Sequence, residues 1–243
     1  MRAREITAAG RSAADVYRDR VVGGRGVGAL LVHELSALAL EPLPGALGIV
    51  ARRALYPFRL RRLGRGAVIG RNVVLRHPRR ISLGERVVID DNCLLDGKGE
   101  GEGGLFVGDG VFVGRNSSLY CKGGRIEVGE GAVLGVGVVL NSSNRLVLEP
   151  GVQVGGGSYL ISGGAYDLDA PLAAALQDGL ASRGETRIGR GALLGANVTV
   201  TDGSRIGEGA VVGAGSVVSQ EIPAGTLAMG VPARVLRRTG ARA

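Results

Sequence analysis

Aliphatic residues recur at every sixth position over much of this chain. The longest unbroken run has its anchors at Ile188, Leu194, Val200, Ile206, Val212 and Val218. Glycine follows four of these six anchors, and a small or compact residue stands four places after each of the first five. A six-residue period fits neither a helix of about 3.6 residues per turn nor an alternating strand, but it fits a short strand followed by a tight turn.

The same period appears upstream in blocks that short insertions separate. The anchors of these blocks are Ile69, Leu75, Ile81; Leu83, Ile89, Leu95; Val107, Val113, Leu119; Val128, Leu134, Leu140; and Leu148, Val154, Leu160. Three units complete a triangular coil with its anchors inside, and stacked coils share one core. We assign to the glycine beside each anchor the backbone freedom that a corner needs. The pattern predicts a parallel β-helix over residues 64–230, and it disfavours a β-sandwich, whose turns recur every ~8–12 residues.

The period stops after Leu160 and resumes at Ile188. We therefore predict an inserted loop over residues 163–187, which is long enough to be functional. Residues 171–181 are expected to form a helix that begins at Pro171, a residue favoured in the first turn. The leucines of this segment are spaced to form one apolar stripe, which would cover a pocket or a neighbouring subunit.

The first 63 residues lack the repeat and are predicted to be helical. One helix is expected over 27–41 and a second over about 46–56, with prolines after each. The first would have one apolar face, formed by Val27, Leu30, Leu31, Leu35 and Leu38. The second would carry Arg52 and Arg53. Two roles remain open for this region, a cap on the first coil or peripheral docking on a membrane.

The formal charge of +8 is concentrated at the two ends of the chain. Residues 1–66 contain 12 Arg and 5 acids, residues 67–233 contain 14 basic and 17 acidic residues, and residues 234–243 contain 4 Arg and no acid. A basic, apolar N-terminal region suits an anionic surface, so peripheral membrane contact through 1–66 stays one of the two open roles. The apolar run is too interrupted to span a bilayer. Nucleic-acid binding is not expected, because the basic ends lack interleaved aromatic residues.

Cysteine and histidine usage limits the possible chemistry. Two cysteines, Cys93 and Cys121, do not make a disulfide framework, and we expect reduced thiols in a cytoplasmic protein. The N-terminus shows no signal-peptide pattern. The chain has two histidines, His33 and His77, so no cluster of Cys and His with metal-ligand spacing exists and no metal is expected.

The C-terminal repeats resemble a known family. The segments are Ile188-Gly-Arg-Gly-Ala-Leu-Leu-Gly-Ala-Asn-Val, Ile206-Gly-Glu-Gly-Ala-Val-Val-Gly-Ala-Gly-Ser-Val-Val, Glu221-Ile-Pro-Ala-Gly and Gly230-Val-Pro-Ala-Arg-Val. Together with Arg76-His-Pro, Ile89-Asp-Asp and Tyr159-Leu-Ile-Ser-Gly-Gly, they resemble the maltose/galactoside acetyltransferase group of the hexapeptide-repeat acyltransferase superfamily. The likeness covers about residues 65–238. It is specific for the superfamily and not for a substrate.

This resemblance implies a fold, a reaction and an assembly. Members are left-handed β-helices, usually homotrimers with active sites between neighbouring subunits. They transfer an acyl group, commonly acetyl, from coenzyme A to a hydroxyl or an amine, often of a sugar. We therefore expect O-acetyl transfer from acetyl-CoA or another acyl-CoA to a saccharide or related hydroxyl compound. Phe106 and Phe112, each next to an anchor, are expected to point outward at a subunit seam.

The resemblance also implies where coenzyme A binds. Backbone groups beside Gly195, Ala196 and Ala214 would line the pantetheine arm, and Ser219 and Gln220 would lie near the nucleotide end. Family members often have Thr-Lys at that last pair, so a phosphate-binding charge is absent here. Arg234 and Arg237, with Arg238 beside them in the basic tail 231–243, could supply it, because guanidinium groups bind phosphate through paired hydrogen bonds.

The catalytic histidine of the family is absent. Its usual setting is Gly-Gly, then His-Asp, and the corresponding stretch here places Tyr166 at the histidine position, followed by Asp167 and Asp169. Three hypotheses remain open. A carboxylate, Asp167 or Asp169, acts as the base; Tyr166 takes part, as a donor to a developing oxyanion; or the chain is a catalytically inactive β-helix that binds a ligand or partner. A carbonic anhydrase β-helix is set aside because it needs three metal-binding histidines.

Overall fold

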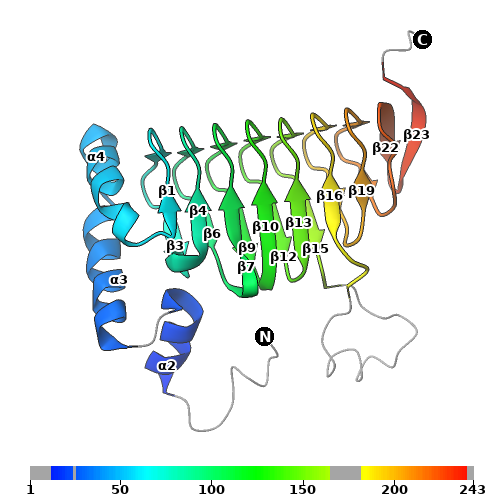
Figure 1. The fold of residues 1–243 in the computed structure, drawn as a ribbon. Coiled ribbons are helices and arrows are strands. Elements are labelled where there is room, and N and C mark those ends of the chain that lie inside the picture. The colour runs from blue at the N-terminus through cyan, green and yellow to red at the C-terminus, as the bar shows by residue number, and fades with distance from the viewer. Residues whose placement is uncertain (1–11, 24–25, 165–181, 240–243) are drawn as a thin grey trace.

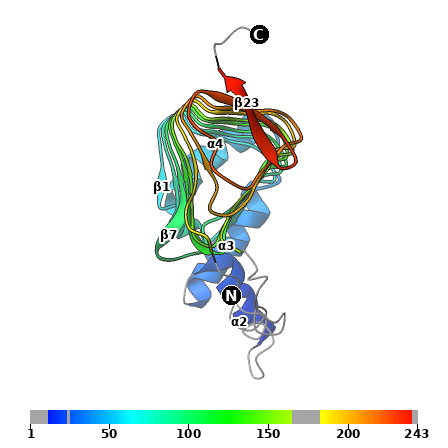
Figure 2. The same ribbon diagram turned by 90° about the vertical axis from the view of Figure 1, so that its right-hand side faces the viewer.

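Each six-residue unit forms a short strand and a corner, and three units complete one coil of a left-handed parallel β-helix (Figure 1). The computed structural model describes residues 12–23, 26–164 and 182–239. Its coils stack along one axis, so that strands of successive coils pair side by side, and the end-on view in Figure 2 shows a three-sided prism. The fold class expected from the six-residue period is confirmed.

Three sheets form the sides of the prism. Sheet A contains β1 (Arg62–Leu63), β4 (Ile81–Leu83), β7 (Gly99–Val107), β10 (Gly123–Val128), β13 (Arg145–Leu148), β16 (Thr186–Ile188) and β19 (Arg205–Ile206). Sheet B contains β2 (Val68–Ile69), β5 (Val88–Ile89), β8 (Phe112–Val113), β11 (Val133–Leu134), β14 (Gln153–Val154), β17 (Leu193–Leu194), β20 (Val211–Val212), β22 (Thr226–Gly230) and β23 (Ala233–Arg238). Sheet C contains β3 (Val74–Arg76), β6 (Leu94–Asp96), β9 (Ser118–Cys121), β12 (Val139–Ser142), β15 (Tyr159–Ser162), β18 (Thr199–Val200) and β21 (Val217–Val218). Within the described residues every strand pair is parallel, apart from the antiparallel pair of β22 and β23.

The aliphatic anchors form the core, as the period predicts. In sheet B the register stacks the buried anchors one above another in a single inward column along the axis: Ile69, Ile89, Val113, Leu134, Val154, Leu194 and Val212. The small residues four places after an anchor are buried too, for example Ala192 and Ser216. Full burial of an aliphatic side chain contributes about 1.5–3 kcal/mol. Because each coil supplies only a few such side chains, stability depends on the stack.

The glycine beside each anchor has a different role from the one that the sequence suggests. Gly195 and Gly213 do not have positive φ; the left-handed residues come two positions later, at Asn197 and Gly215, with φ of 57° and 71°. A Cβ on Gly195 would lie 2.6 Å from the backbone nitrogen of Ala214 in the next coil. These glycines are therefore required because adjacent corners approach closely, and the expectation of backbone freedom at that position was wrong.

Helices close the N-terminal end of the prism (Figure 1). They are α2 (Ala13–Tyr17), the π-helical η1 (Arg18–Val22), α3 (Val27–Leu40), α4 (Gly45–Leu55) and the single 3-10 turn η2 (Tyr56–Phe58); a second 3-10 turn, η3 (Pro78–Arg80), lies between β3 and β4. The two predicted helices correspond to α3 and α4. Arg52 on α4 is buried, and its guanidinium donates to the carbonyls of Leu40, Leu43 and Ile69 at 2.8–2.9 Å. This side chain thus joins both helices to the first strand of sheet B.

The apolar face predicted for the first helix is exposed. Val27, Leu31, Leu35 and Leu38 lie on the solvent side of α3, while His33 and Leu40 face the protein. α4 and η2 contact the first coil through Arg52, Tyr56 and the buried Leu60 that follows them, and η1 contacts it through the carbonyls of Asp19 and Val21, which bind His77. The apolar side of α3 therefore takes no part in capping the coil.

The inserted loop leaves the β-helix after β15 and returns at β16, which pairs with β13. Residues 165–181 of this loop, including the helix expected over 171–181, lie outside the described residues. At the C-terminus β23 turns back and pairs with β22, so the first part of the basic tail is a strand of the last coil.

Candidate coenzyme A site

The residues expected to line the pantetheine arm lie together at one corner of the prism. Gly195 and Ala196 follow β17 at the corner between sheets B and C, and Ala214 occupies the same corner one coil later. The amide of Gly215 donates to the carbonyl of Ala196 at 2.9 Å, which fixes this stacking. Ala196 and Ala214 are both exposed. The result is a narrow, smooth corner on which an extended ligand could lie along the axis.

Arg234 lies beside the same corner. A Cβ on Gly213 would approach the Cβ of Met229 to 2.8 Å, so β22 continues the column formed by the two late corners. Met229 pairs in turn with Arg234 of β23. Arg237 pairs with Leu227 farther along the strand, and its guanidinium donates to the carbonyl of Arg238. Three exposed arginines, Arg234, Arg237 and Arg238, therefore project from the strand that closes the last coil.

Ser219 and Gln220 lie where sheet C ends. Both are exposed and directly follow β21. The Gln220 amide donates to the carbonyl of Ala233 at 3.3 Å, next to Arg234 in the chain. The Ser216 hydroxyl accepts from the Gly230 amide at 3.1 Å, which joins the start of the tail to the last coil. The structure therefore gathers the expected cofactor residues around the C-terminal coils, with Arg237 at their edge.

The three candidate catalytic residues, Tyr166, Asp167 and Asp169, lie outside the described residues. The base of their loop is described, and Asp202 holds it. One oxygen of the Asp202 carboxylate accepts from the Gly163 amide and, at 3.0 Å, from the Ser182 hydroxyl. Its other oxygen accepts from the Arg183 amide at 2.5 Å. Asp202 is buried and joins both ends of the loop to the following coil.

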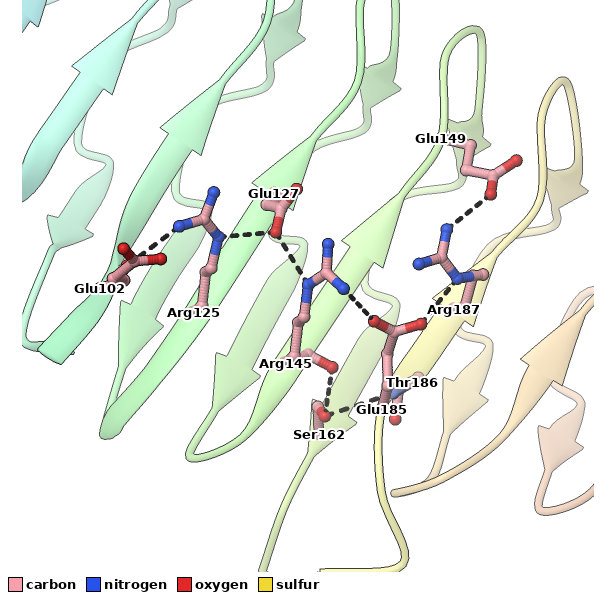
Figure 3. A network of polar contacts seen from close by, with 9 residues as sticks. All are labelled: Glu102, Arg125, Glu127, Arg145, Glu149, Ser162, Glu185, Thr186 and Arg187. Atoms are coloured by element: carbon pink, nitrogen blue, oxygen red, sulfur yellow. Dashed lines mark hydrogen bonds and ion pairs between the residues drawn. The ribbon is translucent and has the colours of Figure 1, made fainter. Parts of the chain in front are cut away.

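A second polar group closes the loop base from the side of sheet A. The Thr186 hydroxyl donates to the carbonyl of Ile161 at 2.7 Å and accepts from the Gly203 amide at 3.0 Å. The Ser162 hydroxyl donates to the carbonyl of Arg145 at 2.6 Å, and Figure 3 shows Ser162 between Arg145 and Thr186. Buried hydroxyls that are fully hydrogen-bonded give a unique local structure. The sequence pattern missed Asp202, which lies at a corner, and Thr186, which begins β16 two residues before the anchor Ile188, because neither is an anchor position.

Polar side chains also gather on the outer face of sheet C next to the loop. The Tyr120 and Tyr159 hydroxyls lie 3.2 Å apart, and the Asn141 amide lies 3.4 Å from the Tyr159 hydroxyl. Burial, with the hydrogen bond to Tyr159, raises the pKa of Tyr120, so its phenol remains a protonated donor. Tyr159 precedes the loop base by a few residues. Tyr120 and Asn141 were missed, although the strand register could have placed them in one outward row.

Both histidines have structural roles. His77 is buried, with Nδ1 2.8 Å from the Asp96 carboxylate and Nε2 2.9 Å from the carbonyl of Asp19. His33 lies 3.1 Å from the Arg59 guanidinium, and burial together with that charge lowers the pKa of His33. Both side chains are therefore engaged near the N-terminal end, away from the base of the inserted loop.

On the outer face of sheet A, arginine and glutamate side chains form a network of ion pairs (Figure 3). Glu127 lies between Arg125 and Arg145 at 2.6 and 2.9 Å, and Arg145 continues to Glu185 at 2.8 Å. Arg187 then joins Glu185 to Glu149, at 2.7 Å to each. Burial alone would raise the pKa of Glu127, but hydrogen bonds from Arg145 and Arg125 lower it. Because these guanidinium groups already bind carboxylates, this face is a poorer anion site than the C-terminal strand.

Over the described residues, no group of three or more His, Cys, Asp or Glu side chains is placed to hold a metal ion.

Sequence comparisons identify the repeat. The family model described as "Bacterial transferase hexapeptide (six repeats)" matches residues 185–220, and the model described as "Hexapeptide repeat of succinyl-transferase" matches residues 104–142. Both segments lie within the β-helix, and the first contains the corner at Ala196 and Ala214. No curated protein sequence matches the chain.

Solved structures share the fold. One is a mutant of AntD, an N-acyltransferase from Bacillus cereus, in complex with dTDP-4-amino-4,6-dideoxyglucose and coenzyme A; its TM-score is 0.52 at 18% identity, covering 78% of this chain and 90% of that one. Another is a UDP-N-acetylglucosamine acyltransferase from Campylobacter jejuni, with a TM-score of 0.52 at 15% identity, covering 73% of this chain and 70% of that one. At these identities the likeness is one of fold. The two repeat models add that residues 104–142 and 185–220 are built from hexapeptide repeats of the kind found in bacterial transferases.

Proposed function

We propose that this protein is an acyl-CoA-dependent acyltransferase that transfers an acyl group, first of all acetyl, to a hydroxyl of a saccharide or a related compound. The observation that carries the proposal is the corner of Ala196 and Ala214, which continues through Met229 to Arg234. An exposed, smooth corner suits an extended pantetheine arm. The arginines at its end suit the phosphate groups of coenzyme A.

The related structures support the donor and the type of acceptor. The AntD structure contains coenzyme A together with a dTDP-linked sugar, and the Campylobacter protein is named for acyl transfer on UDP-N-acetylglucosamine. We propose the same donor here and a sugar-like acceptor. The polar group formed by Tyr120, Asn141 and Tyr159 is our candidate for contacts with acceptor hydroxyls, because it lies on sheet C next to the loop base.

In the proposed reaction the acceptor oxygen attacks the thioester carbonyl. A carbon–oxygen bond forms, the carbon–sulfur bond breaks, and the hydroxyl proton passes through a base to the departing sulfur. Asp167 and Asp169 are the proposed bases, and Tyr166 is the alternative as a donor to the oxyanion. Asp202 positions the loop that carries them, since it binds both Gly163 and Arg183.

We also propose a homotrimer in the cytoplasm. The outward residues of sheet B are mostly apolar: Val68, Val88, Phe112, Val133, Gln153, Leu193, Val211 and Leu227. Apolar side chains in one straight row suit contact with another copy of the chain. The cytoplasm is the compartment of the proposed donor, and both cysteines are free thiols, which suits its reducing conditions.

Calorimetric titration with coenzyme A and acetyl-CoA tests the proposal first. We expect saturable binding at about one site per subunit, and weakening of at least about tenfold in the double variant Arg234→Ala/Arg237→Ala, because charge-assisted hydrogen bonds are lost. The matched control is Arg205→Ala, which removes a charge from the same late coils on sheet A. No binding at millimolar coenzyme A would overturn the proposal.

Acceptor screens then separate an enzyme from a binding protein. The alternative function, a catalytically inactive β-helix that binds a ligand or partner, is favoured by the lack of any histidine between residues 78 and 243. Loss of transfer in Asp167→Asn would support Asp167 as the base, and loss in Tyr166→Phe would support Tyr166 as the donor to the oxyanion. The inactive form would be favoured if the chain binds coenzyme A but transfers no acyl group to any acceptor, and if Tyr166→His does not gain transfer activity.

A further inference from the structure

The N-terminal helices present an apolar face to solvent. Six side chains form it, and each is between 54% and 78% exposed: Val27, Leu31, Leu35 and Leu38 on α3, with Leu47 and Val50 on α4. We call this set the N-terminal apolar face. Exposed apolar groups of this extent usually mark a binding surface on a soluble domain. Their concentration on two neighbouring helices distinguishes them from single exposed residues elsewhere.

The packing of the two helices leaves this face directed away from the β-helix. On α3 the four residues follow one another at intervals of three or four, so they share one side of the helix. The opposite side contributes the buried His33 and Leu40, and α4 turns Gly48 and Arg52 inward. Figures 1 and 2 show both helices across the N-terminal end of the prism. The apolar face is therefore part of the outer surface of this end.

Exposed basic residues lie at the end of α4 and follow it in the chain, while the acids of the N-terminal helices are engaged. Arg53, Arg61, Arg62 and Arg65 are exposed at and beyond the C-terminal end of α4. Among the acids, Asp15 pairs with Arg18 at 2.5 Å, the Glu34 carboxylate accepts from the Tyr17 hydroxyl at 2.6 Å, and Glu41 lies 3.8 Å from Arg59. The described part of residues 1–66 contains 8 Arg and 4 acids, so the charge at this end of the molecule is positive.

An aromatic side chain adjoins the basic residues. Phe58, one of three phenylalanines in the chain, is 71% exposed at the end of η2. Aromatic and arginine side chains that flank an apolar helix face are typical of helices that lie at a membrane interface. Over the described residues, no single helix is long and apolar enough to cross a membrane; Ala13–Val22 and Val27–Leu40 reach that length only as a pair bent by 67°.

We propose that the N-terminal apolar face docks on the surface of an anionic lipid bilayer, with α3 and α4 lying in the plane of the interface. Leucine and valine side chains enter the boundary of the acyl chains, and the flanking arginines bind headgroup phosphates. A second copy of the chain is the less suitable occupant, because it would bring two positive rims together. This inference does not rest on the acyltransferase activity.

Cosedimentation of the full chain with vesicles tests the proposal. We expect binding to phosphatidylcholine vesicles that contain about 30% phosphatidylglycerol, little binding to phosphatidylcholine alone, and release at high salt, since the anionic surface attracts the arginines. Leu38→Glu places a charge on the apolar face and should lower the bound fraction about tenfold. The double variant Arg53→Ser/Arg62→Ser should be released from the anionic vesicles at a lower salt concentration than the unmodified chain.

The matched control is Val136→Glu, which adds the same charge at an exposed apolar residue of the β-helix. It should bind vesicles as the unmodified chain does, and an unchanged melting temperature of Leu38→Glu confirms that this variant is folded. Lack of binding to anionic vesicles at low salt would overturn the proposal. An equal loss of vesicle binding in Val136→Glu would also overturn it. The same holds if the chain does not bind vesicles but self-associates in solution, and Leu38→Glu abolishes that self-association.

Discussion

Cys93 and Cys121 lie inside the prism and are expected to be unreactive. Burial raises the pKa of Cys93 to about 11 and that of Cys121 to about 12. At pH 8 the reactive thiolate is then ~0.1% of Cys93 or less. We predict that iodoacetamide modifies neither cysteine in the folded protein at this pH and both in guanidinium chloride, as measured by mass spectrometry. An exposed thiol introduced as Ser219→Cys is the positive control, and rapid native labelling of Cys93 or Cys121 would contradict the core assignment.

Individual residues differ in how far the sequence predicts them. The anchors, such as Leu194 and Val212, are predictable because a fixed period assigns them all to one environment. Arg52 is not, since neighbouring arginines on a helix suggest two solvated side chains. The structure buries Arg52, where it binds three carbonyls, and leaves Arg53 exposed. Only the arrangement of α4 on the first coil decides which of them is buried.

At the scale of elements, Asp202 determines how firmly the inserted loop is held. Asp202→Asn keeps the shape of the side chain but leaves the amides of Gly163 and Arg183 with weaker or lost partners. A buried donor without a partner costs about 1–3 kcal/mol. We therefore predict that trypsin cleaves after Arg183, the sole basic residue between 163 and 185, about tenfold faster, because cleavage follows the open population.

The control for this experiment is Asp109→Asn, a carboxylate that accepts from the Glu85 amide at 2.8 Å at another corner. This change weakens a hydrogen bond at a corner far from the loop in the stack, because the amide oxygen of asparagine is a poorer acceptor than a carboxylate. It should leave cleavage after Arg183 unchanged. Equal acceleration in both variants would mean that global unfolding, and not the base of the loop, controls access to Arg183.

The two predicted helices were placed well, but the environment of the first was not evident. An apolar stripe shows that its residues share one side of a helix and does not show what that side contacts. In α3 that side faces outward, and the contact with the first coil is made by α4, η2 and η1. In the β-helix the repeat predicts the environment of a residue better than an apolar stripe does in a helix, because every anchor recurs at the same place on the next coil. The three candidate catalytic residues stay predictions from the resemblance.

At the scale of the whole molecule, the three sides of the prism differ in chemistry. The outward row of sheet A is Arg62, Ser82, Phe106, Glu127, Val147, Arg187 and Arg205, mostly polar and charged. There Phe106 lies between the guanidinium groups of Arg61 and Arg125, at 5.7 and 4.0 Å from the ring centre. Phe112 belongs to the apolar row of sheet B. The two phenylalanines expected at one seam thus lie on different sides, and Phe112 alone lies in the proposed subunit contact.

The trimer proposal predicts that charge in the sheet B row separates the subunits. Val133→Arg/Leu193→Arg places two arginines in that row, and burying them against another copy would be costly. Sedimentation velocity should show a trimer for the unmodified chain, a monomer for this variant, and a trimer for the sheet A control Ser82→Arg. In a trimer with its prism axes along the threefold axis, three N-terminal apolar faces lie at one end and bind one bilayer together. The monomeric variant should therefore also bind anionic vesicles more weakly, although its helices are unchanged; a monomeric unmodified chain would refute both expectations at once.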